Sequence, residues 1–545
     1  MSACQGMYAT PEVVVTRTPS VEHLKPPLNS PYVVNNPTLS SLPPMQEASG
    51  RWKESRFDAS NLPEGLIRLL RQAGYAVTED QPSSAIRLQP LKPASIGQAP
   101  ILARWLFLLV APFPTLADGT TWDELQAAWL GQHPWSDPAT PWKGRPLVMS
   151  PITYEAVRAV WGQPASEHDI VMLKPEDEVQ EVAWAIGAWA IIPFEILNPR
   201  WKVLRIDGQS GLEAEATGFP LWISYGAPGF EGDVGPVVTN YHPEHLVTVI
   251  LSGTTALVRA TALRIEEKGV NYPGQALAPL LRAADVLHIS NEVAFDPQCP
   301  PANPLRREAR FCSDPRYLGL LQEIGTDVIE LTGNHLLDWG EEPFRYTLDL
   351  YRQVHLSFYG GGANRAEAEA PLKIERKGTR LAFLGCNAVG PETVLATEQR
   401  AGAAPCDLER MSIQIQALHH EGYLPIVTFQ HLEVQDFKPA SQARYDFQTA
   451  AQAGAVIVSG SQAHFPQGFA LKSGALIHYG LGNLFFDQMF YWNRRAFLDR
   501  HLFYEGRYLG VELITIILED YAQPRLMTTA ERTEMLQNVF AASEW

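Results

Sequence analysis

The stretch ELTGNHLLDWG, residues 330–340, decides how the second half of this chain folds. An apolar run leads into it from a predicted helix and stops at Gly333. An amide and an imidazole side chain, Asn334 and His335, follow at once. Because a buried strand ends in two such side chains, we predict that the strand places them in a functional site.

Working outward, the chain from residue 246 repeats this arrangement. The apolar stretches LVTVILSG, VLHIS, TRLAFLGCN, LPIVTF and AVIVSG alternate with predicted helices. Short, continuously apolar strands between amphipathic helices are typical of a sheet that is covered on both faces. We therefore predict an α/β domain over residues 245–540.

Polar side chains recur just beyond the carboxyl ends of these predicted strands. Because such ends gather along one edge of an open α/β sheet, we expect a common pocket. Any one of these residues taken alone is better explained as a polar group at a strand end whose hydrogen bonds are satisfied. The set comprises Thr254, Asn291, Glu292, Asn334, His335, Gln430, His431, Ser461, His464 and Asn483.

Length and composition limit the alternatives. A chain of 545 residues is too long for one ordinary core, so two or three domains are expected. Its 46% hydrophobic and 19% charged residues are typical of a soluble globular protein. The formal net charge of −17, without a basic run, argues against a nucleic-acid partner. The most apolar stretch, ILARWLFLLVAPFP, is short and ends at prolines, so it predicts a buried core segment.

The first half divides into two parts. Residues 1–50 are rich in Pro, Ser, Thr and Asn, a composition that predicts an extended tether. Residues 51–240 predict a smaller α/β domain, with a boundary inside the Gly/Pro-rich segment 227–246. Its stretch WAIIPFEILNPRWKVLRIDGQ, followed by GFPLWISYG, resembles part of the phosphate-type periplasmic solute-binding proteins.

The cysteines bear on the cellular compartment. Cys299 and Cys312 flank one Pro-rich loop, and Cys386 and Cys406 flank another. We predict a disulfide across each loop and hence an oxidising compartment; four unrelated buried thiols are the alternative. Cys4 follows Ser-Ala, which resembles the end of a bacterial lipoprotein signal, so we expect a lipid anchor there. A chance Ser-Ala-Cys in a cytosolic tail is the alternative.

Four segments together resemble one family: DVIELTGNHLLDWG, YGGGANRAEAEAP, AQAGAVIVSGSQAHFPQGFA and LIHYGLGNLFFDQ. They are similar, in order and spacing, to motifs of the CapA-type capsule and poly-γ-glutamate synthesis proteins. The resemblance implies a calcineurin-like metallophosphoesterase fold for residues 245–540, a four-layer αββα sandwich. It also implies work on an anionic γ-glutamyl polymer or wall component at the bacterial envelope.

The resemblance assigns roles to individual residues. Metal ligands would be Glu292, Asn334, His464 and His431, the last displaced by one position from the family's imidazole. Asn483 and Asp487 match the family's closing motif. His335 would be a general acid or an anion ligand, oriented by Asp338.

Three positions depart from the family. Thr254 stands where the family has Asp, and Gln430 and Ser461 stand where it has His. A two-metal phosphoesterase needs a bridging carboxylate and several imidazoles. The remaining residues predict one divalent cation of unspecified identity, or none.

Two classes of function follow. The first is a hydrolase or transferase of the envelope, lipid-anchored at the outer face of a membrane or secreted. The second is a non-catalytic protein that binds an anionic polymer or solute in the divergent pocket.

Overall fold

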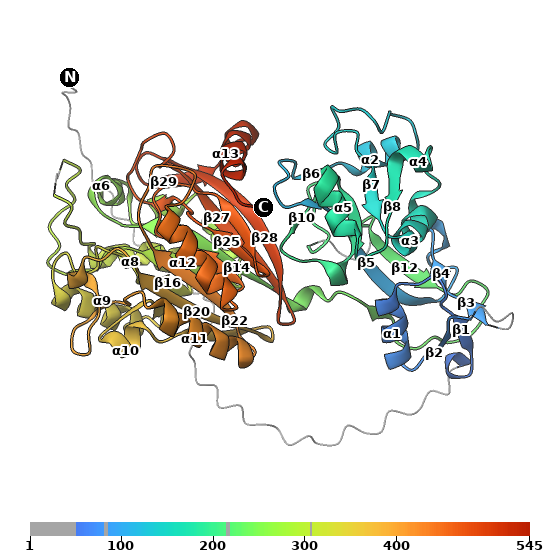
Figure 1. Ribbon diagram of the computed structural model, residues 1–545, viewed down its shortest axis with the longest axis horizontal. Coiled ribbons are helices and arrows are strands. Elements are labelled where there is room, and N and C mark those ends of the chain that lie inside the picture. Colours follow the sequence, from blue (N-terminus) through green and yellow to red (C-terminus); the bar gives the residue numbers. More distant parts are fainter. Residues whose placement is uncertain (1–50, 81–84, 214–217, 306–307) are drawn as a thin grey trace, which may run out of the picture.

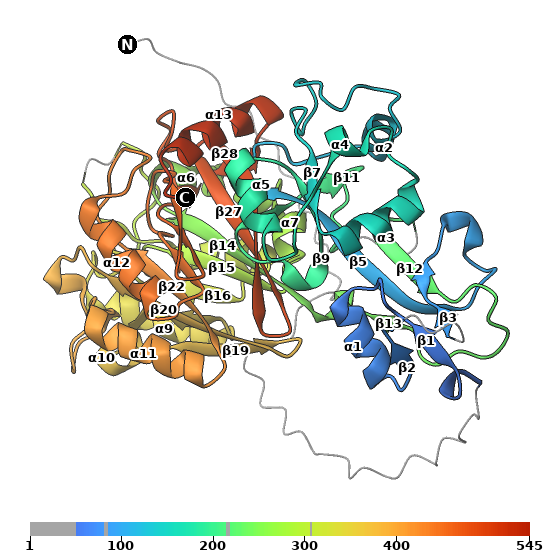
Figure 2. The same cartoon turned by 45° about the vertical axis from the view of Figure 1, so that its right-hand side comes forward.

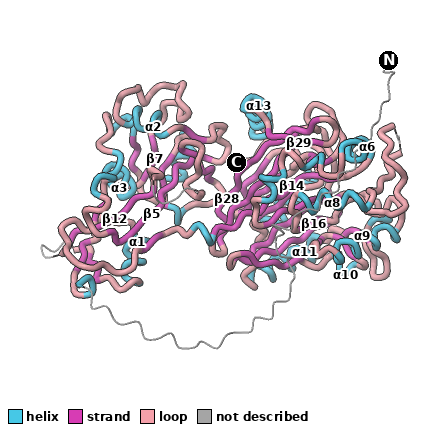
Figure 3. The backbone as a smooth tube through the Cα atoms, turned by 180° about the vertical axis from the view of Figure 1, so that it is seen from behind, coloured by secondary structure: helices cyan, strands magenta, loops and turns pink. Residues whose placement is uncertain are grey.

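The computed structural model describes residues 51–80, 85–213, 218–305 and 308–545. Two domains lie side by side, and strand β28 and the C-terminus face the N-terminal domain (Figure 1). Strands form the interior of both domains, while helices and loops surround them (Figure 3). The predicted tether and Cys4 lie outside the described residues.

The N-terminal domain is built on one mixed sheet of order β4-β12-β5-β9-β7-β8, with β10 and β13 also paired to β5. Its centre is β5 (Ile101–Pro112), the apolar stretch noted above, which is buried as predicted. The other strands are β4 (Gln89–Pro90), β7 (Leu147–Met149), β8 (Val171–Leu173), β9 (Ala190–Pro193), β10 (Trp201–Val203), β12 (Trp222–Gly226) and β13 (Val238–Thr239). A small parallel sheet comprises β1 (Arg56–Asp58), β2 (Ala76–Thr78) and β3 (Ile86–Arg87), and another pairs β6 (Gly119–Thr120) with β11 (Arg205–Ile206).

Two helices of this domain show well-defined capping residues. The Thr121 hydroxyl accepts from the Glu124 N–H and so caps α2 (Trp122–Trp129). Gly187 ends α5 (Val179–Ile186) in the left-handed region, with φ +63°. The remaining helices are α1 (Glu64–Gln72), α3 (Pro151–Trp161) and α4 (Glu167–Ile170).

The C-terminal domain contains two sheets packed face to face. The first has the order β17-β16-β15-β14-β27-β28-β29, with β26 paired to β14, and the second has the order β19-β20-β22-β23-β25-β24. The first comprises β14 (Leu246–Thr255), β15 (Val286–Asn291), β16 (Val328–Glu330), β17 (Ser357–Tyr359), β26 (Asn483–Phe485), β27 (Arg495–Tyr504), β28 (Arg507–Glu519) and β29 (Gln523–Leu526). The second comprises β19 (Leu372–Arg376), β20 (Thr379–Asn387), β22 (Leu424–Gln430), β23 (Ile457–Ser459), β24 (Phe469–Lys472) and β25 (Ala475–His478).

Helices cover the outer face of each sheet. One buried cluster joins the first sheet to α6 (Arg259–Lys268), α7 (Ala278–Arg282), α8 (Leu318–Glu323) and α9 (Glu341–Gln353). Another joins the second sheet to α11 (Leu408–His420) and α12 (Ser441–Gln452), which lie together on one side in Figure 2. A third cluster fills the space between the sheets. The predicted four-layer sandwich is therefore confirmed.

The remaining elements lie at the edges of the sandwich. They are α10 (Arg365–Ala368), α13 (Thr529–Ala541) and the short pair β18 (Gly361–Gly362) and β21 (Gly402–Ala403). None of the helices among the described residues has the length and hydropathy needed to cross a membrane.

Aromatic side chains join the two domains. The Tyr504 ring of β27 lies 4.8 Å from the ring centre of Phe194 and 5.3 Å from that of Tyr241. Phe113 contacts Phe469 in the same way, with ring centres 5.4 Å apart. These residues are buried, so the contacts bury apolar surface between the domains and hold them together.

Candidate metal centre

The predicted edge of the first sheet brings distant segments into contact. Gly333, just before Asn334, packs directly on the residue that follows β15. A Cβ atom at Gly333 would lie 2.7 Å from both Cα and O of Glu292. Only glycine allows this approach, which sets the loop carrying Asn334 and His335 against Glu292.

Three side chains form a group with the spacing of metal ligands: Glu292, Glu433 and His464. The His464 Nε2 atom lies 3.7 Å from Oε1 of Glu292 and 3.5 Å from Oε1 of Glu433. One ligand atom from each residue lies within 4.8 Å of the other two. Atoms about 2 Å from one shared ion lie at most about 4 Å apart, so a small movement would complete such a site.

The carboxylate of Glu292 needs a positively charged partner. Its side chain is fully buried, and among the described residues neither of its oxygens has a hydrogen-bond partner. Burial raises the pKa of Glu292, but the nearby His464 outweighs this and the net shift is downward. A buried, ionised carboxylate without a hydrogen-bond partner is costly unless a cation lies close to it. The residues present therefore fit one divalent cation.

Asn483 orients His464 for this role. The Nδ1 atom of His464 lies 2.7 Å from Oδ1 of Asn483, so Nδ1–H donates and Nε2 faces the two glutamates. Metal-bound imidazoles are usually held by such a second hydrogen bond. Burial lowers the pKa of His464, yet Glu292 and Glu433 raise it to about 9. In the absence of a metal, a protonated His464 is thus the counter-ion of Glu292.

His335 and Asp338 contact each other, as their spacing predicted, while their role stays a prediction. Nδ1 of His335 lies 2.7 Å from Oδ2 of Asp338, which also accepts from the N–H of Phe311. Burial lowers the pKa of His335, but the hydrogen bond to Asp338 and the charge of Glu292 outweigh it and the pKa is raised. His335 is therefore suited to holding a proton near Glu292.

Arg259 contributes a cation to the same pocket, and sequence reasoning missed it. Its guanidinium forms an ion pair with Asp487, whose carboxylate also accepts from the N–H of Ala260. The guanidinium lies between the rings of Phe311 and Phe486, 5.0 and 4.8 Å from their centres. The charge of Arg259 also lowers the pKa of Glu292. Its backbone φ of +47° is unusual for a residue other than glycine.

One predicted metal ligand lies outside this group. Nε2 of His431 lies 2.8 Å from Oδ2 of Asp446 in α12, and Nδ1 accepts from the N–H of Leu432. Both ring nitrogens are thus engaged away from Glu292. The same loop supplies Glu433 instead, which is 38% exposed. Glu433 could have been identified from the sequence, because it is a carboxylate that lies soon after the end of a predicted strand.

The other predicted pocket residues have varied surroundings. Asn334 Oδ1 and both amide atoms of Gln430 are buried and lack hydrogen-bond partners among the described residues. Asn291 instead donates to the Val293 carbonyl and the Tyr351 hydroxyl. Ser461 donates to Glu330, and Thr254 to the Ser461 carbonyl at 3.5 Å.

The four cysteines pair within the loops that they flank. Cys299 is joined to Cys312 and Cys386 to Cys406, with Cα atoms 5.8 and 5.0 Å apart. The first bond closes the loop next to Phe311, which contacts the His335 ring. The predicted pairing is therefore also the pairing in the structure, while its formation in the cell stays a prediction.

The C-terminal domain is thus a calcineurin-like sandwich with carboxylates and imidazoles at its strand ends. Residues 248–488 match the model of the family described as bacterial capsule synthesis protein PGA_cap. The PGA biosynthesis protein CapA of Bacillus subtilis is 24% identical over 226 residues, 41% of this chain. The capsule biosynthesis protein CapA of Bacillus anthracis is 25% identical over 306 residues, 54% of this chain. The matches span 59% and 73% of those two proteins.

Similar solved structures include a phosphatase from Mycoplasma pneumoniae and the NAD nucleotidase of Haemophilus influenzae. The first is 14% identical, with a TM-score of 0.32, and covers 50% of this chain and 94% of its own. The second is 8% identical, with a TM-score of 0.31, and covers 54% of this chain and 55% of its own. The fold assignment rests on the sheets and helices described above. The resemblance of residues 51–240 to solute-binding proteins stays a prediction.

Proposed function

We propose that this protein acts at the bacterial envelope in the synthesis, export or processing of an anionic capsule polymer such as poly-γ-glutamate. The family match of residues 248–488 supports this proposal, as do the names of the two Bacillus relatives, a PGA biosynthesis protein and a capsule biosynthesis protein. An anionic wall component is the alternative substrate.

The convergence of Glu292, Glu433 and His464 carries the chemical part of the proposal. These residues would hold one divalent cation, and Asn334, with its unpaired buried Oδ1, is the fourth candidate ligand. When bound, such an ion would polarise an oxygen of the substrate or lower the pKa of a water molecule. A second ion is not expected, because Thr254, Gln430 and Ser461 replace the family's Asp and His.

The remaining side chains have roles that need no ion. His335, whose pKa is raised, would donate a proton to a leaving group through Nε2, while Asp338 holds its other nitrogen. Arg259, fixed by Asp487, would attract an anionic group of the substrate. Together they favour a hydrolase or transferase acting on an anionic chain.

A non-catalytic binding protein is the second candidate. It is favoured by three side chains that can carry positive charge beside the carboxylates of the metal-free pocket: His335, His464 and Arg259. Such a pocket would hold a carboxylate of the polymer without cleaving it.

Incubation of poly-γ-glutamate with the full chain in Mn²⁺ or Zn²⁺ separates the two candidates. If the protein is an enzyme, the natural chain should shorten the polymer. His335→Gln should slow this shortening by roughly 100-fold or more, the usual contribution of a general acid. Glu505→Gln, an exposed carboxylate on the β27–β28 turn, should leave the rate unchanged. Unchanged polymer that nevertheless binds, more weakly in Arg259→Gln, would favour the binding protein. Neither cleavage nor binding would contradict both.

We also propose that the chain is held at the outer face of a membrane by a lipid on Cys4. Two acyl chains suffice for stable anchoring at a membrane. Expression with the upstream region restored, followed by fractionation, tests this. Equal release of the natural protein and Cys4→Ser into the soluble fraction would contradict it.

A further inference from the structure

A cavity of about 640 Å³ lies between the two domains, away from the candidate metal centre. Ligand sites often occur at domain interfaces and have volumes of roughly 300–1,000 Å³. Apolar side chains form most of its wall. Those of the N-terminal domain include Phe113 and Trp201, and those of the C-terminal domain include Leu502, Leu509, Val511 and Phe540.

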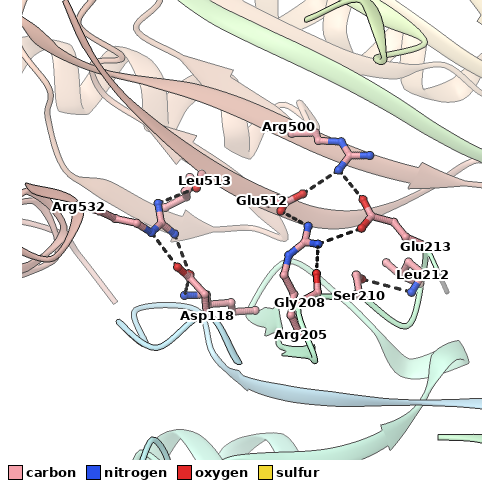
Figure 4. A network of polar contacts seen from close by, with 11 residues as sticks. Asp118, Arg205, Gly208, Ser210, Leu212, Glu213, Arg500, Glu512, Leu513 and Arg532 are labelled. Atoms are coloured by element: carbon pink, nitrogen blue, oxygen red, sulfur yellow. Dashed lines mark hydrogen bonds and ion pairs between the residues drawn. The ribbon is translucent and has the colours of Figure 1, made fainter. Parts of the chain in front are cut away.

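Charged side chains also line this cavity and form a network of polar contacts (Figure 4). Glu512 bridges Arg205 and Arg500, and Glu213 contacts the same two arginines. On the other side of the network, Arg532 of α13 donates two hydrogen bonds of 2.9 Å to Asp118. These ion pairs cross from one domain to the other, so the cavity depends on both.

The cavity has one more cation than it has carboxylates. Its cations are Lys202, Arg205, Arg500 and Arg532, and its carboxylates are Asp118, Glu213 and Glu512. This excess stands out in a chain with a formal net charge of −17.

Among these cations, Arg500 has hydrogen-bond donors that its ion pairs do not use. It contacts Glu213 and Glu512 only through Nη1, at 2.7 and 2.9 Å. Within the described part of the chain, Nε and Nη2 of Arg500 have no hydrogen-bond acceptor. An arginine with free donors, beside an apolar wall, suits a carboxylate or phosphate attached to an apolar body.

We propose that this cavity binds a small amphipathic anion, with its charged group on Arg500 and its apolar body against Trp201, Leu502 and Leu509. The ligand would contact both domains and stabilise their present arrangement by mass action. This inference is independent of the polymer site and of any metal.

Titration calorimetry on the full chain tests the proposal with three probes: decanoate, decyl phosphate and decan-1-ol. The two anions share the required chemistry, and their relative affinities distinguish a carboxylate ligand from a phosphate ligand. We expect at least one anion to bind at least tenfold more tightly than the alcohol. Equal affinity for decan-1-ol, or no binding of either anion up to about 1 mM, would overturn the proposal.

Two substitutions locate the site. Arg500→Gln should weaken binding of the anion at least tenfold. Leu502→Trp fills the cavity without changing its charge and should abolish binding of the anion. This second variant keeps the test valid if Arg500→Gln also disturbs the contacts between the domains. Leu173→Trp, at an exposed position of β8, is the matched control and should bind as the natural chain does. Unchanged affinity in Leu502→Trp, with far-UV circular dichroism confirming its fold, would place the ligand elsewhere and overturn the proposal.

Discussion

His464 stands between a carboxylate and an amide: its Nε2 lies 3.7 Å from Oε1 of Glu292, and its Nδ1 lies 2.7 Å from Oδ1 of Asn483. The strand that carries Asn483, β26, pairs with β14, whose end also borders Glu292. The first sheet therefore positions Glu292 and Asn483, and His464 reaches both from the loop after β23 of the second sheet.

Asn483→Ala should weaken metal binding by about 10- to 100-fold, the usual effect of removing such a supporting group. The reason is that His464 would lose the acceptor that keeps Nε2 directed at Glu292. Calorimetric titration with Zn²⁺ or Mn²⁺ measures the change. Asn538→Ala, at an exposed position of α13, is the control and should bind metal normally. Equal affinities in the two variants would remove Asn483 from the site.

Gly333→Ala should disrupt the candidate centre more than the fold. The new Cβ would lie 2.7 Å from the backbone of Glu292, so one of the two segments must shift. We expect metal affinity to fall at least tenfold. Gly319→Ala in α8 meets only a side-chain methyl group, at 3.3 Å, and should retain affinity. Normal metal binding by Gly333→Ala would show that the close approach is not required.

The N-terminal domain should lose stability as pH rises from about 4.5 to about 7. Burial raises the pKa of Glu195 from 4.5 to about 7, so in this range the folded state binds more protons than the unfolded state. The free energy of unfolding therefore decreases with pH, by on the order of 3 kcal/mol at most.

Glu195→Gln should remove this dependence. Urea unfolding at pH 5 and pH 8 is the measurement: the variant should match the natural chain at pH 5 and exceed it at pH 8. The amide also keeps the oxygen that accepts from Nδ2 of Asn240 at 2.8 Å. Parallel pH profiles for the two proteins would mean that Glu195 titrates normally.

Both disulfides should form in protein isolated from an oxidising compartment. Closing loops with sequence separations of 13 and 20 residues could each add roughly 3 kcal/mol by the chain-entropy model. Non-reducing peptide mapping should recover Cys299 linked to Cys312 and Cys386 linked to Cys406. Free thiols at all four positions would also count against the extracytoplasmic location.

The fold of residues 245–540 could be predicted because its parallel strands are continuously apolar and each ends in a distinctive motif. The N-terminal helices followed from capping residues such as Thr121 and Gly187. In contrast, the long antiparallel strands β27 and β28 carry Arg500 and Glu512, which look like solvent-facing residues in the sequence. Their burial against the other domain depends on Arg205 and Glu213, about 290 residues earlier, which no local pattern reveals.

The candidate site was predicted where a strand end fixes the side chain. Glu292, Asn334 and His335 follow strands of the first sheet, and His464 meets Glu292 from the loop after β23 of the second sheet. His431 and Glu433 lie in a loop beyond β22, where strand alternation no longer determines direction. There the sequence could not show that His431 faces Asp446 while Glu433 faces His464.

The central claim is that Glu292, Glu433 and His464 hold one divalent cation. Metal analysis of protein purified without chelator, for the natural chain and His464→Ala, tests it most directly, with the exposed His420→Ala as control. We expect about one equivalent of metal in the natural chain and in the control, and a loss of most of this metal in His464→Ala. Equal metal content in all three proteins, or none in the natural chain even after incubation with Zn²⁺ or Mn²⁺, would contradict it.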